Sequence, residues 1–280
     1  MGQFTYYFNP LTPQDLTAKA LILSLISSID TDRQGIASLI HAGALFEIEP
    51  ATLRVAATRL LKEGLLESPE RGVYVPGPKA RALTRRVQQW RDVADKVVPW
   101  NGDWLVAMTH HLGRRDRRQL RTRERALALF GYQEAGDGLW ARPANLARPL
   151  DAHREDLIGI GADDTLPVLR VSGMAGPGLR NWPALWSAQA LERSYDDAIG
   201  AMTESLARLP GLSAADAARE TLLIGQAAIR AINFDPLLPP ALGNQKRFLE
   251  MVAAMRAYNE AGIGCWQAYQ ATATAPSGGG

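Results

Sequence analysis

The sequence predicts an α+β protein in which helical and strand patterns occupy separate parts of the chain. Three observations support this class. Helical patterns and then two short apolar runs fill residues 1–78, strand and helix patterns alternate over residues 100–173, and residues 180–270 are helical throughout. A linking helix is expected over residues 79–99, and the small, polar tail over residues 271–280 is expected to be disordered.

Residues 50–64 form the most distinctive helical pattern of the chain. Pro50 suits the start of a helix, and Gly64 suits its end. Apolar residues recur at helical spacing and would bury against preceding helices: Leu53, Ala56, Ala57, Leu60 and Leu61. The outer side is left with side chains that can reach phosphates and base edges in a major groove: Thr52, Arg54, Thr58, Arg59 and Lys62.

The neighbouring patterns complete an N-terminal winged helix-turn-helix over residues 1–78. A first helix is expected from Leu16 to Ile29, and Thr31 begins a stretch that can cap a second helix. Two apolar runs after Gly64 flank a turn and predict a two-stranded wing, from which Arg71 would enter a minor groove. We therefore expect this part to bind double-stranded DNA. The alternative is an amphipathic helix whose basic face is merely solvated.

The formal net charge of +2 conceals an uneven distribution. Residues 71–125 hold 14 Lys and Arg against 5 Asp and Glu, whereas residues 1–70 and 126–280 are net acidic. A basic block of this kind can neutralise DNA phosphates beside a groove contact, although it can also be two solvated, arginine-rich helices. The block contains Lys79, Arg81, Arg85, Arg86, Arg91, Arg114, Arg115, Arg117, Arg118, Arg121, Arg123 and Arg125.

The rest of the chain predicts a central ferredoxin-like domain over residues 100–173 and a C-terminal helical domain over residues 180–270. The linking helix that precedes them is expected from Leu83 to Val98. The central patterns are a strand over 104–108, a helix over 117–130, a strand over 139–142, a helix near 150–158 and a strand over 166–171. The C-terminal patterns are helices over 185–209, 213–234 and 245–259.

Composition argues against several function classes. The single cysteine, Cys265, excludes an internal disulfide framework, and four scattered histidines make a structural zinc site improbable. No apolar run approaches the length of about 18 residues that a membrane span requires. The N-terminal residues lack the charged and apolar regions of a signal peptide. We therefore expect a cytoplasmic protein that binds no metal or cofactor, contacts no membrane and is not an enzyme.

Five short patterns follow one another along nearly the whole chain. They are the helix around Arg54 with its Glu63-Gly64 stop, the wing stretch 70–74, the stretch 100–104 with two tryptophans, Leu185-Trp186 with Tyr195, and Arg230 with Asp235-Pro236. In this order they resemble the PaaX family of bacterial regulators, named for the repressor of phenylacetic acid degradation. One departure lies at residues 243–246, where the family usually has a proline and a tryptophan.

The resemblance implies a homodimeric transcriptional repressor of an aromatic-compound catabolic operon, bound to an inverted-repeat operator. It also implies release by a small-molecule effector, either an aromatic acyl-CoA (an aryl-CoA thioester) or an aromatic acid. A cleft for such a molecule needs apolar walls and a few cations. Residues on the C-terminal helices that could converge there, and that otherwise serve packing, are Trp182, Trp186, Arg193, Tyr195, Arg230 and Phe234.

Two other functions remain open. A metal-dependent nuclease built on the ferredoxin-like domain would need paired carboxylates near its first strand, and Asp103 and Asp116 form no convincing pair. A winged-helix scaffold that contacts only other proteins would fit the acidic balance of residues 1–70.

Overall fold

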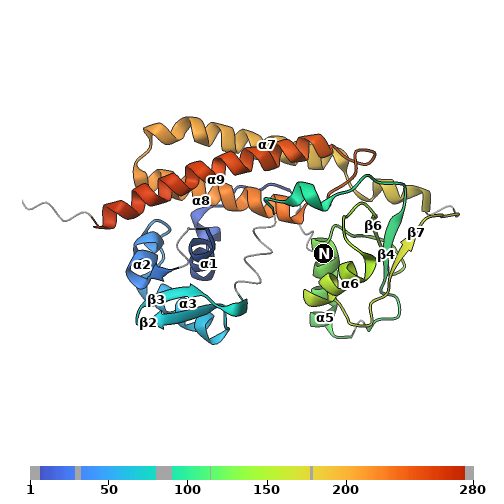
Figure 1. Cartoon of the computed structure of the whole chain (residues 1–280), viewed down its shortest axis with the longest axis horizontal. Coiled ribbons are helices and arrows are strands. Elements are labelled where there is room, and N and C mark those ends of the chain that lie inside the picture. The colour runs from blue at the N-terminus through green and yellow to red at the C-terminus, as the bar shows by residue number, and fades with distance from the viewer. Residues whose placement is uncertain (1–6, 29–32, 80–89, 114, 177–178, 275–280) are drawn as a thin grey trace, which may run out of the picture. The chain divides into compact units, whose positions relative to one another are not determined.

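The computed structural model describes residues 7–28, 33–79, 90–113, 115–176 and 179–274. Helices and two antiparallel sheets make up this part of the chain, which confirms the α+β class (Figure 1). Within the described ranges, no helix combines the length and apolar character that a bilayer crossing requires.

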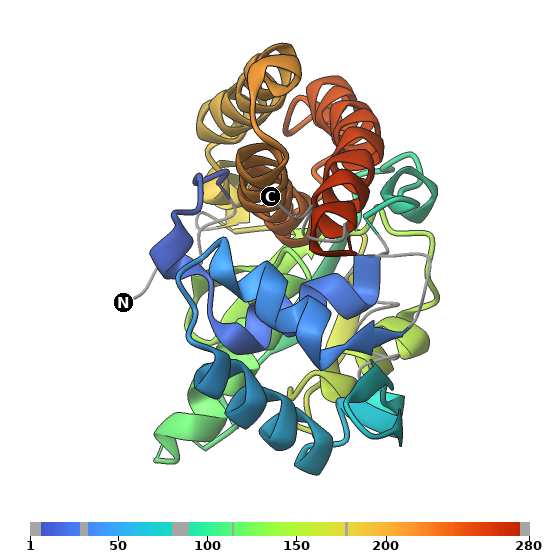
Figure 2. The same ribbon diagram turned by 90° about the vertical axis from the view of Figure 1, so that its left-hand side faces the viewer.

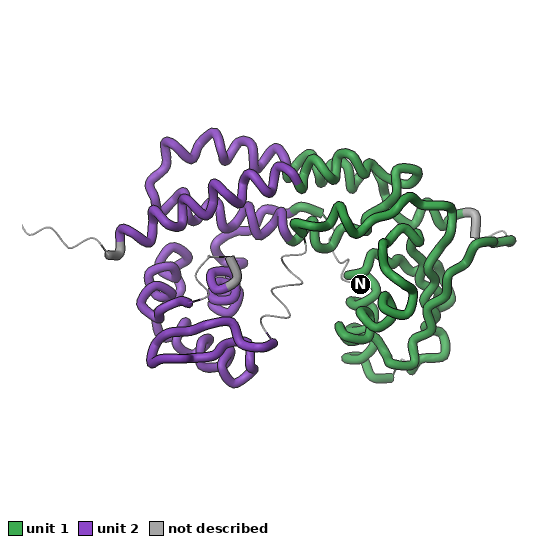
Figure 3. Tube along the Cα trace, viewed as in Figure 1, with its two compact units in different colours: residues 1–8, 90–198, 230–252 green, residues 9–89, 199–229, 253–280 purple. Residues whose placement is uncertain are grey.

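The chain divides into two compact units whose segments are not consecutive (Figure 3). Unit 1 contains residues 1–8, 90–198 and 230–252, and unit 2 contains residues 9–89, 199–229 and 253–280. The units therefore group the C-terminal residues differently from the consecutive segments that the sequence predicts. The predicted segment boundaries remain predictions.

Unit 2 opens with three helices and a three-stranded antiparallel sheet in the order β1-β3-β2. A short 3-10 helix, η1 (Pro13–Asp15), precedes them. Helix α3 packs on both α1 and α2 (Figures 1 and 2). The two-residue strand β1 was not predicted, because a strand this short carries no periodic signal. The bounds are α1 Ala18–Ser28, β1 Gln34–Gly35, α2 Ile36–Ala44, α3 Pro50–Lys62, β2 Leu66–Glu70 and β3 Val73–Pro76.

Two of the three C-terminal helices, the second and the third, contribute buried residues to the core of unit 2. The three are α7 (Ala188–Arg208), α8 (Ala214–Phe234) and α9 (Gln245–Thr274), which contribute residues to both units. Trp266 and Tyr269 of α9 are buried in one apolar cluster with residues of α1, α2 and α3. The Tyr269 ring stacks on His41 of α2 at a centroid distance of 4.2 Å, and its hydroxyl donates to the His41 carbonyl oxygen. Helix α9 thus packs against the helices α1, α2 and α3 and stabilises them.

Unit 1 contains a four-stranded sheet in the order β5-β6-β4-β7, with every neighbouring pair antiparallel. Leu105 and Ala107 of β4 are buried with residues of α5 and α6, so these helices cover one face of the sheet. Trp104 points to the other face, where its ring lies 5.4 Å from that of Trp182 and 6.1 Å from that of Trp186. The bounds are β4 Trp104–Met108, α5 Arg117–Leu129, β5 Gln133–Gly136, β6 Leu139–Pro143, α6 Leu150–Gly159, β7 Val168–Val171 and the 3-10 helix η3 Leu179–Leu185.

Two secondary-structure predictions need correction. The linking helix predicted to end at Val98 is a turn and a short 3-10 helix, η2 (Val93–Lys96), from residue 90 onward; residues 80–89 lie outside the described residues. Residues 97 and 98 are instead extended and bonded to residues 146 and 145, which ends any helix before them. Strand β5 was not predicted.

The second correction concerns α9, which continues to Thr274, past the predicted end at Asn259 and into the predicted tail. Gly262 lies within this helix and does not break it; a Cβ at this position would lie 3.4 Å from the Cβ of Thr221 on α8. Residues 275–280 lie outside the described residues.

Candidate nucleic-acid interface

Helix α3 buries one side and presents the other to solvent, as its sequence pattern predicts. Leu53, Ala57 and Leu60 are buried in the core of unit 2, and each is 1% exposed or less. Gly64 ends the helix with φ at +71°, a conformation that glycine adopts without steric cost. The five predicted DNA contacts on α3 (Thr52, Arg54, Thr58, Arg59 and Lys62) are all exposed, and the exposed Arg71 lies in the β2–β3 turn.

The cations of this surface have no partner within the described residues. Arg54, Arg59, Lys62 and Arg71 form no ion pair with any residue that the structure describes. A group of like charges held without counter-charges raises the local potential and attracts an external polyanion.

Two of the neighbouring acids are neutralised locally. Glu63 accepts from Lys19 at 2.6 Å, and Glu70 accepts from Arg33 at 2.6 Å. Both pairs are exposed, so they contribute little to stability, but they reduce the negative potential beside α3 and the wing. Glu47 and Glu49 are exposed just before α3 and form no ion pair with a described residue. Their negative charges therefore repel an anion at the N-terminal end of α3.

One exposed residue of α3, Val55, was missed by the sequence prediction. Its side chain is 51% exposed, although valine is an apolar residue. The prediction selected outer residues by their polarity. The position of Val55 in the helical repeat could have shown its exposure. It lies two residues after Leu53 and two before Ala57, and therefore on the side of the helix opposite the buried residues.

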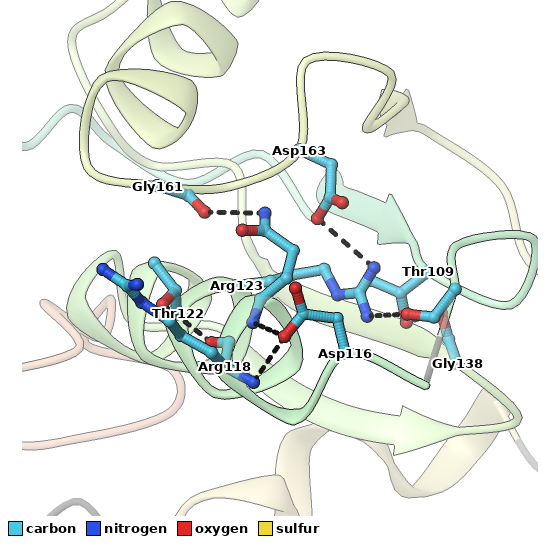
Figure 4. Close-up of polar contacts among 10 residues, drawn as sticks. Thr109, Asp116, Arg118, Thr122, Arg123, Gly138, Gly161 and Asp163 are labelled. Atoms are coloured by element: carbon cyan, nitrogen blue, oxygen red, sulfur yellow. Dashed lines mark hydrogen bonds and ion pairs between the residues drawn. The ribbon is translucent and has the colours of Figure 1, made fainter.

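The basic block is divided between the units, and one of its arginines is buried. Arg123 is 1% exposed and donates to Asp163 at 3.3 Å and to the Gly113 carbonyl oxygen at 3.1 Å (Figure 4). It shares the inner face of α5 with Ala126 and Leu127, so its assignment to the basic surface was wrong. Residues 81, 85, 86 and 114 of the block lie outside the described residues.

The remaining arginines of α5 and its approach form an exposed basic surface on unit 1. None of them forms an ion pair with a residue that the structure describes. Asp116 is occupied elsewhere, because its carboxylate caps α5 by accepting from the backbone of Arg118 and Gln119 (Figure 4). The members of this surface are Arg115, Arg117, Arg118, Arg121 and Arg125.

The six predicted effector residues differ in their exposure and contacts. Trp182 and Trp186 are buried against Trp104, while Arg193 and Arg230 are exposed and Phe234 is half-buried. Tyr195 is the one that lines a hollow in unit 1, together with residues that include Val97, Leu238 and Phe248. The hollow encloses about 10 Å³, room for about one water molecule.

A buried polar pair borders this hollow. The Tyr195 hydroxyl donates to the Asp235 carboxylate at 2.7 Å, and the Leu237 backbone N–H donates to its other oxygen at 2.7 Å. Burial raises the pKa of Asp235 from 3.8 to about 7, against the effect of these hydrogen bonds and of Arg142. Burial also raises the pKa of Tyr195, so its hydroxyl stays protonated and remains the donor.

Arg142 and Asn145 tie the end of β6 to the residues that follow α8. The Asn145 amide donates to the Leu237 carbonyl oxygen at 2.7 Å, and Arg142 donates to the Phe130 and Pro236 carbonyl oxygens. Burial lowers the pKa of Arg142 to about 10, which still leaves it charged at neutral pH. These two buried side chains anchor the 235–237 segment. The sequence pattern does not distinguish them from exposed polar residues, so it did not predict their role.

The carboxylates weighed for a nuclease do not form a pair. Asp103 precedes β4 and lies 3.6 Å from Arg170, whereas Asp116 follows β4 and caps α5. Each carboxylate is thus engaged by a different partner, Asp103 by Arg170 and Asp116 by the first turn of α5. Among the described residues, no group of three or more His, Cys, Asp or Glu side chains could hold a metal ion.

Comparison with known proteins adds the fold and no function. A similar solved structure is the uncharacterized protein Rv0674 from Mycobacterium tuberculosis, with a TM-score of 0.62 over 91% of this chain and 99% of that chain. At 22% sequence identity the likeness shows a shared fold alone. No protein-family model matches the chain, and no curated protein matches it.

Proposed function

We infer that the chain is a sequence-specific DNA-binding transcriptional regulator that places α3 in a major groove. In this proposal the N-terminal elements of unit 2 form a winged helix-turn-helix, with α2 and α3 as the helix pair and β2 and β3 as the wing. The element order α1-β1-α2-α3-β2-β3 and the sheet order β1-β3-β2 support this assignment. Thr52, Arg54, Thr58 and Arg59 then read bases or nearby phosphates, Lys62 holds the backbone, and Arg71 enters a minor groove.

One observation carries the proposal. The exposed face of α3 and the adjoining turn hold four cations that have no ion-pair partner among the described residues, while the acids Glu63 and Glu70 beside them are paired. DNA phosphates would supply the missing counter-charges, and release of their condensed counterions would drive binding. The exposed arginines of α5, which form no ion pair with a described residue, are suited to bind phosphates in the same way.

The finer parts of the proposal extend the resemblance to the PaaX family. Residues 100–173 would be a ferredoxin-like domain, which the β-α-β-β-α-β order and the antiparallel order β5-β6-β4-β7 support. The regulator would act in the cytoplasm as a homodimer on an inverted repeat and repress an aromatic-compound catabolic operon. An aromatic acid or aryl-CoA effector would release it, with reciprocal coupling of about 1–3 kcal/mol between effector and DNA.

Such an effector does not fit the described hollow beside Tyr195. A volume of about 10 Å³ holds about one water molecule, so effector binding there requires the surrounding helices to separate. In this proposal the opened state binds DNA more weakly than the closed state, so that effector and DNA oppose each other.

The test is binding of the purified full-length protein to a duplex selected from a random-sequence library. We expect Arg54→Ala and Arg59→Ala each to weaken binding about tenfold or more, because one good base contact is worth about 1–3 kcal/mol. Arg208→Ala is the matched control, since Arg208 is an exposed arginine of unit 2 already paired with Glu220 at 2.8 Å.

Three outcomes would replace the proposal. Equal affinity of the wild type and both α3 variants at matched salt would remove α3 as the reading element. Cleavage of the duplex that requires a divalent metal and is lost in Asp103→Asn would favour the nuclease. Absence of any salt-sensitive DNA binding would favour the protein scaffold.

A further inference from the structure

Three of the four side chains in the outermost row of α3 carry methyl groups. At about 100° per residue, Ala51, Val55, Thr58 and Lys62 follow one another at spacings of four, three and four and form a single row. The buried residues Leu53, Ala57 and Leu60 form the row on the opposite side of the helix. The exposed row that contains Val55 and Thr58 is therefore the part of α3 that would reach deepest into a groove.

Val55 stands out within this row. It is the most exposed of the large apolar side chains in the described part of the chain, and of those that are exposed it alone belongs to unit 2. Valine offers no donor or acceptor. As a β-branched residue in a helix it holds essentially one rotamer, so its methyl groups are presented at little entropic cost.

Thr58 adds a methyl group to the same row instead of a donor. Its hydroxyl donates to the Arg54 carbonyl oxygen at 2.9 Å, which uses its only proton. The hydroxyl oxygen can still accept, and the methyl group remains available for contact. Donors to base edges must therefore come from the flanks of the row, chiefly from the guanidinium groups of Arg54 and Arg59.

Among the four bases, only thymine presents a methyl group in the major groove. We propose that Val55 is a specificity-determining residue that contacts the 5-methyl group of a thymine in each half-site bound by α3. The inference rests on the proposed function and deepens it. The unpaired cations on both sides of the row favour DNA as the occupant over an apolar protein surface. An RNA duplex is disfavoured because its major groove is too narrow and deep to be read and its uracil lacks the methyl group.

The experiment replaces each thymine of the selected duplex, one pair of symmetric positions at a time, with uracil. This change removes the methyl group and keeps the base pair and the O4 acceptor. We expect one position per half-site at which the wild type loses affinity by about fourfold, the value of burying one methyl group. At that position Val55→Ala should bind the thymine and uracil duplexes within about a factor of two of each other.

Val98→Ala is the matched control, because Val98 is also an exposed valine but belongs to unit 1 and should leave the uracil effect unchanged. A thermal melt of each variant checks that the fold persists, as expected for exposed positions. If the wild type binds its duplex specifically but no uracil change matters, or if the effect persists in Val55→Ala, the inference is overturned and the proposed function stands. If no sequence is enriched in the selection, the proposed function itself fails.

Discussion

Two buried titratable groups in unit 1, Asp235 and His153, should give opposite pH dependences of stability that cancel in the wild type. Burial raises the pKa of Asp235 from 3.8 to about 7. Between these values the folded protein holds one proton more than the unfolded chain, so stability falls as pH rises. Burial, with Arg142 and Arg148, lowers the pKa of His153 from 6.5 to about 3. Between those values the unfolded chain holds the extra proton, so stability falls as pH decreases.

The pH range in which Asp235 affects stability and the range in which His153 does so overlap between pH 3.8 and 6.5. One proton contributes about 1.4 kcal/mol per pH unit, so each group acting alone should change the free energy of unfolding by about 1 kcal/mol between about pH 5 and about pH 6. The wild type should be nearly flat across this interval with respect to these groups. Asp235→Asn should lose stability as the pH falls, whereas His153→Gln should gain it.

Urea unfolding followed by tryptophan fluorescence measures this directly, because six of the 7 tryptophans lie in unit 1 and report on it. Asp235→Asn keeps a group that can accept from Tyr195, so the fold should persist. Each variant removes one of the two groups whose effects on stability oppose each other. If the free energy of unfolding changes with pH in the same way for the wild type and both variants between about pH 5 and about pH 6, the reasoning is refuted.

Three further predictions concern unit 2. Lys62→Gln should reduce the slope of log affinity against log salt by about 0.9 per protomer, measured by anisotropy over a salt series; an unchanged slope would place Lys62 away from phosphates. Trp266→Ala should lower the free energy of unfolding by about 3–5 kcal/mol in a denaturant titration, whereas the exposed neighbour Gln267→Ala should leave it nearly unchanged. Equal losses of unfolding free energy in the two variants would contradict the packing of α9 on α1, α2 and α3. Glu49→Gln should strengthen DNA binding at low salt without altering sequence preference, because it removes an unpaired negative charge at the start of α3; weaker binding would contradict that placement.

The sequence predicted those elements whose burial follows a simple period. Helix α3 alternates buried and exposed residues at helical spacing, and strand β4 was predicted with its observed bounds, Trp104–Met108. Strand β5 was missed because Gln133 and Glu134 give an edge strand with no apolar alternation. The length of α9 was underestimated because Gly262 and Gly264 follow the predicted end at Asn259 and glycine is a weak helix former, whereas the helix continues through both to Thr274.

Single residues were harder to place than elements. Arg123 was assigned to the surface by its charge, although its spacing from Ala126 and Leu127 put it on the inner face of α5. Val55 was overlooked for the converse reason, since it is apolar but lies out of phase with the buried row. The partners of Arg142 lie about 12 and 94 residues away in the chain, and no local pattern encodes contacts of that separation.

The most direct test of DNA recognition by α3 compares affinities for the selected duplex and for a shuffled duplex of the same composition at one salt concentration. We predict that the wild type prefers the selected duplex by about a thousandfold or more, and that Arg54→Ala with Arg59→Ala removes most of this preference. Equal affinity of the wild type for both duplexes would contradict the account, because the unpaired cations of α3 would then bind DNA without reading it.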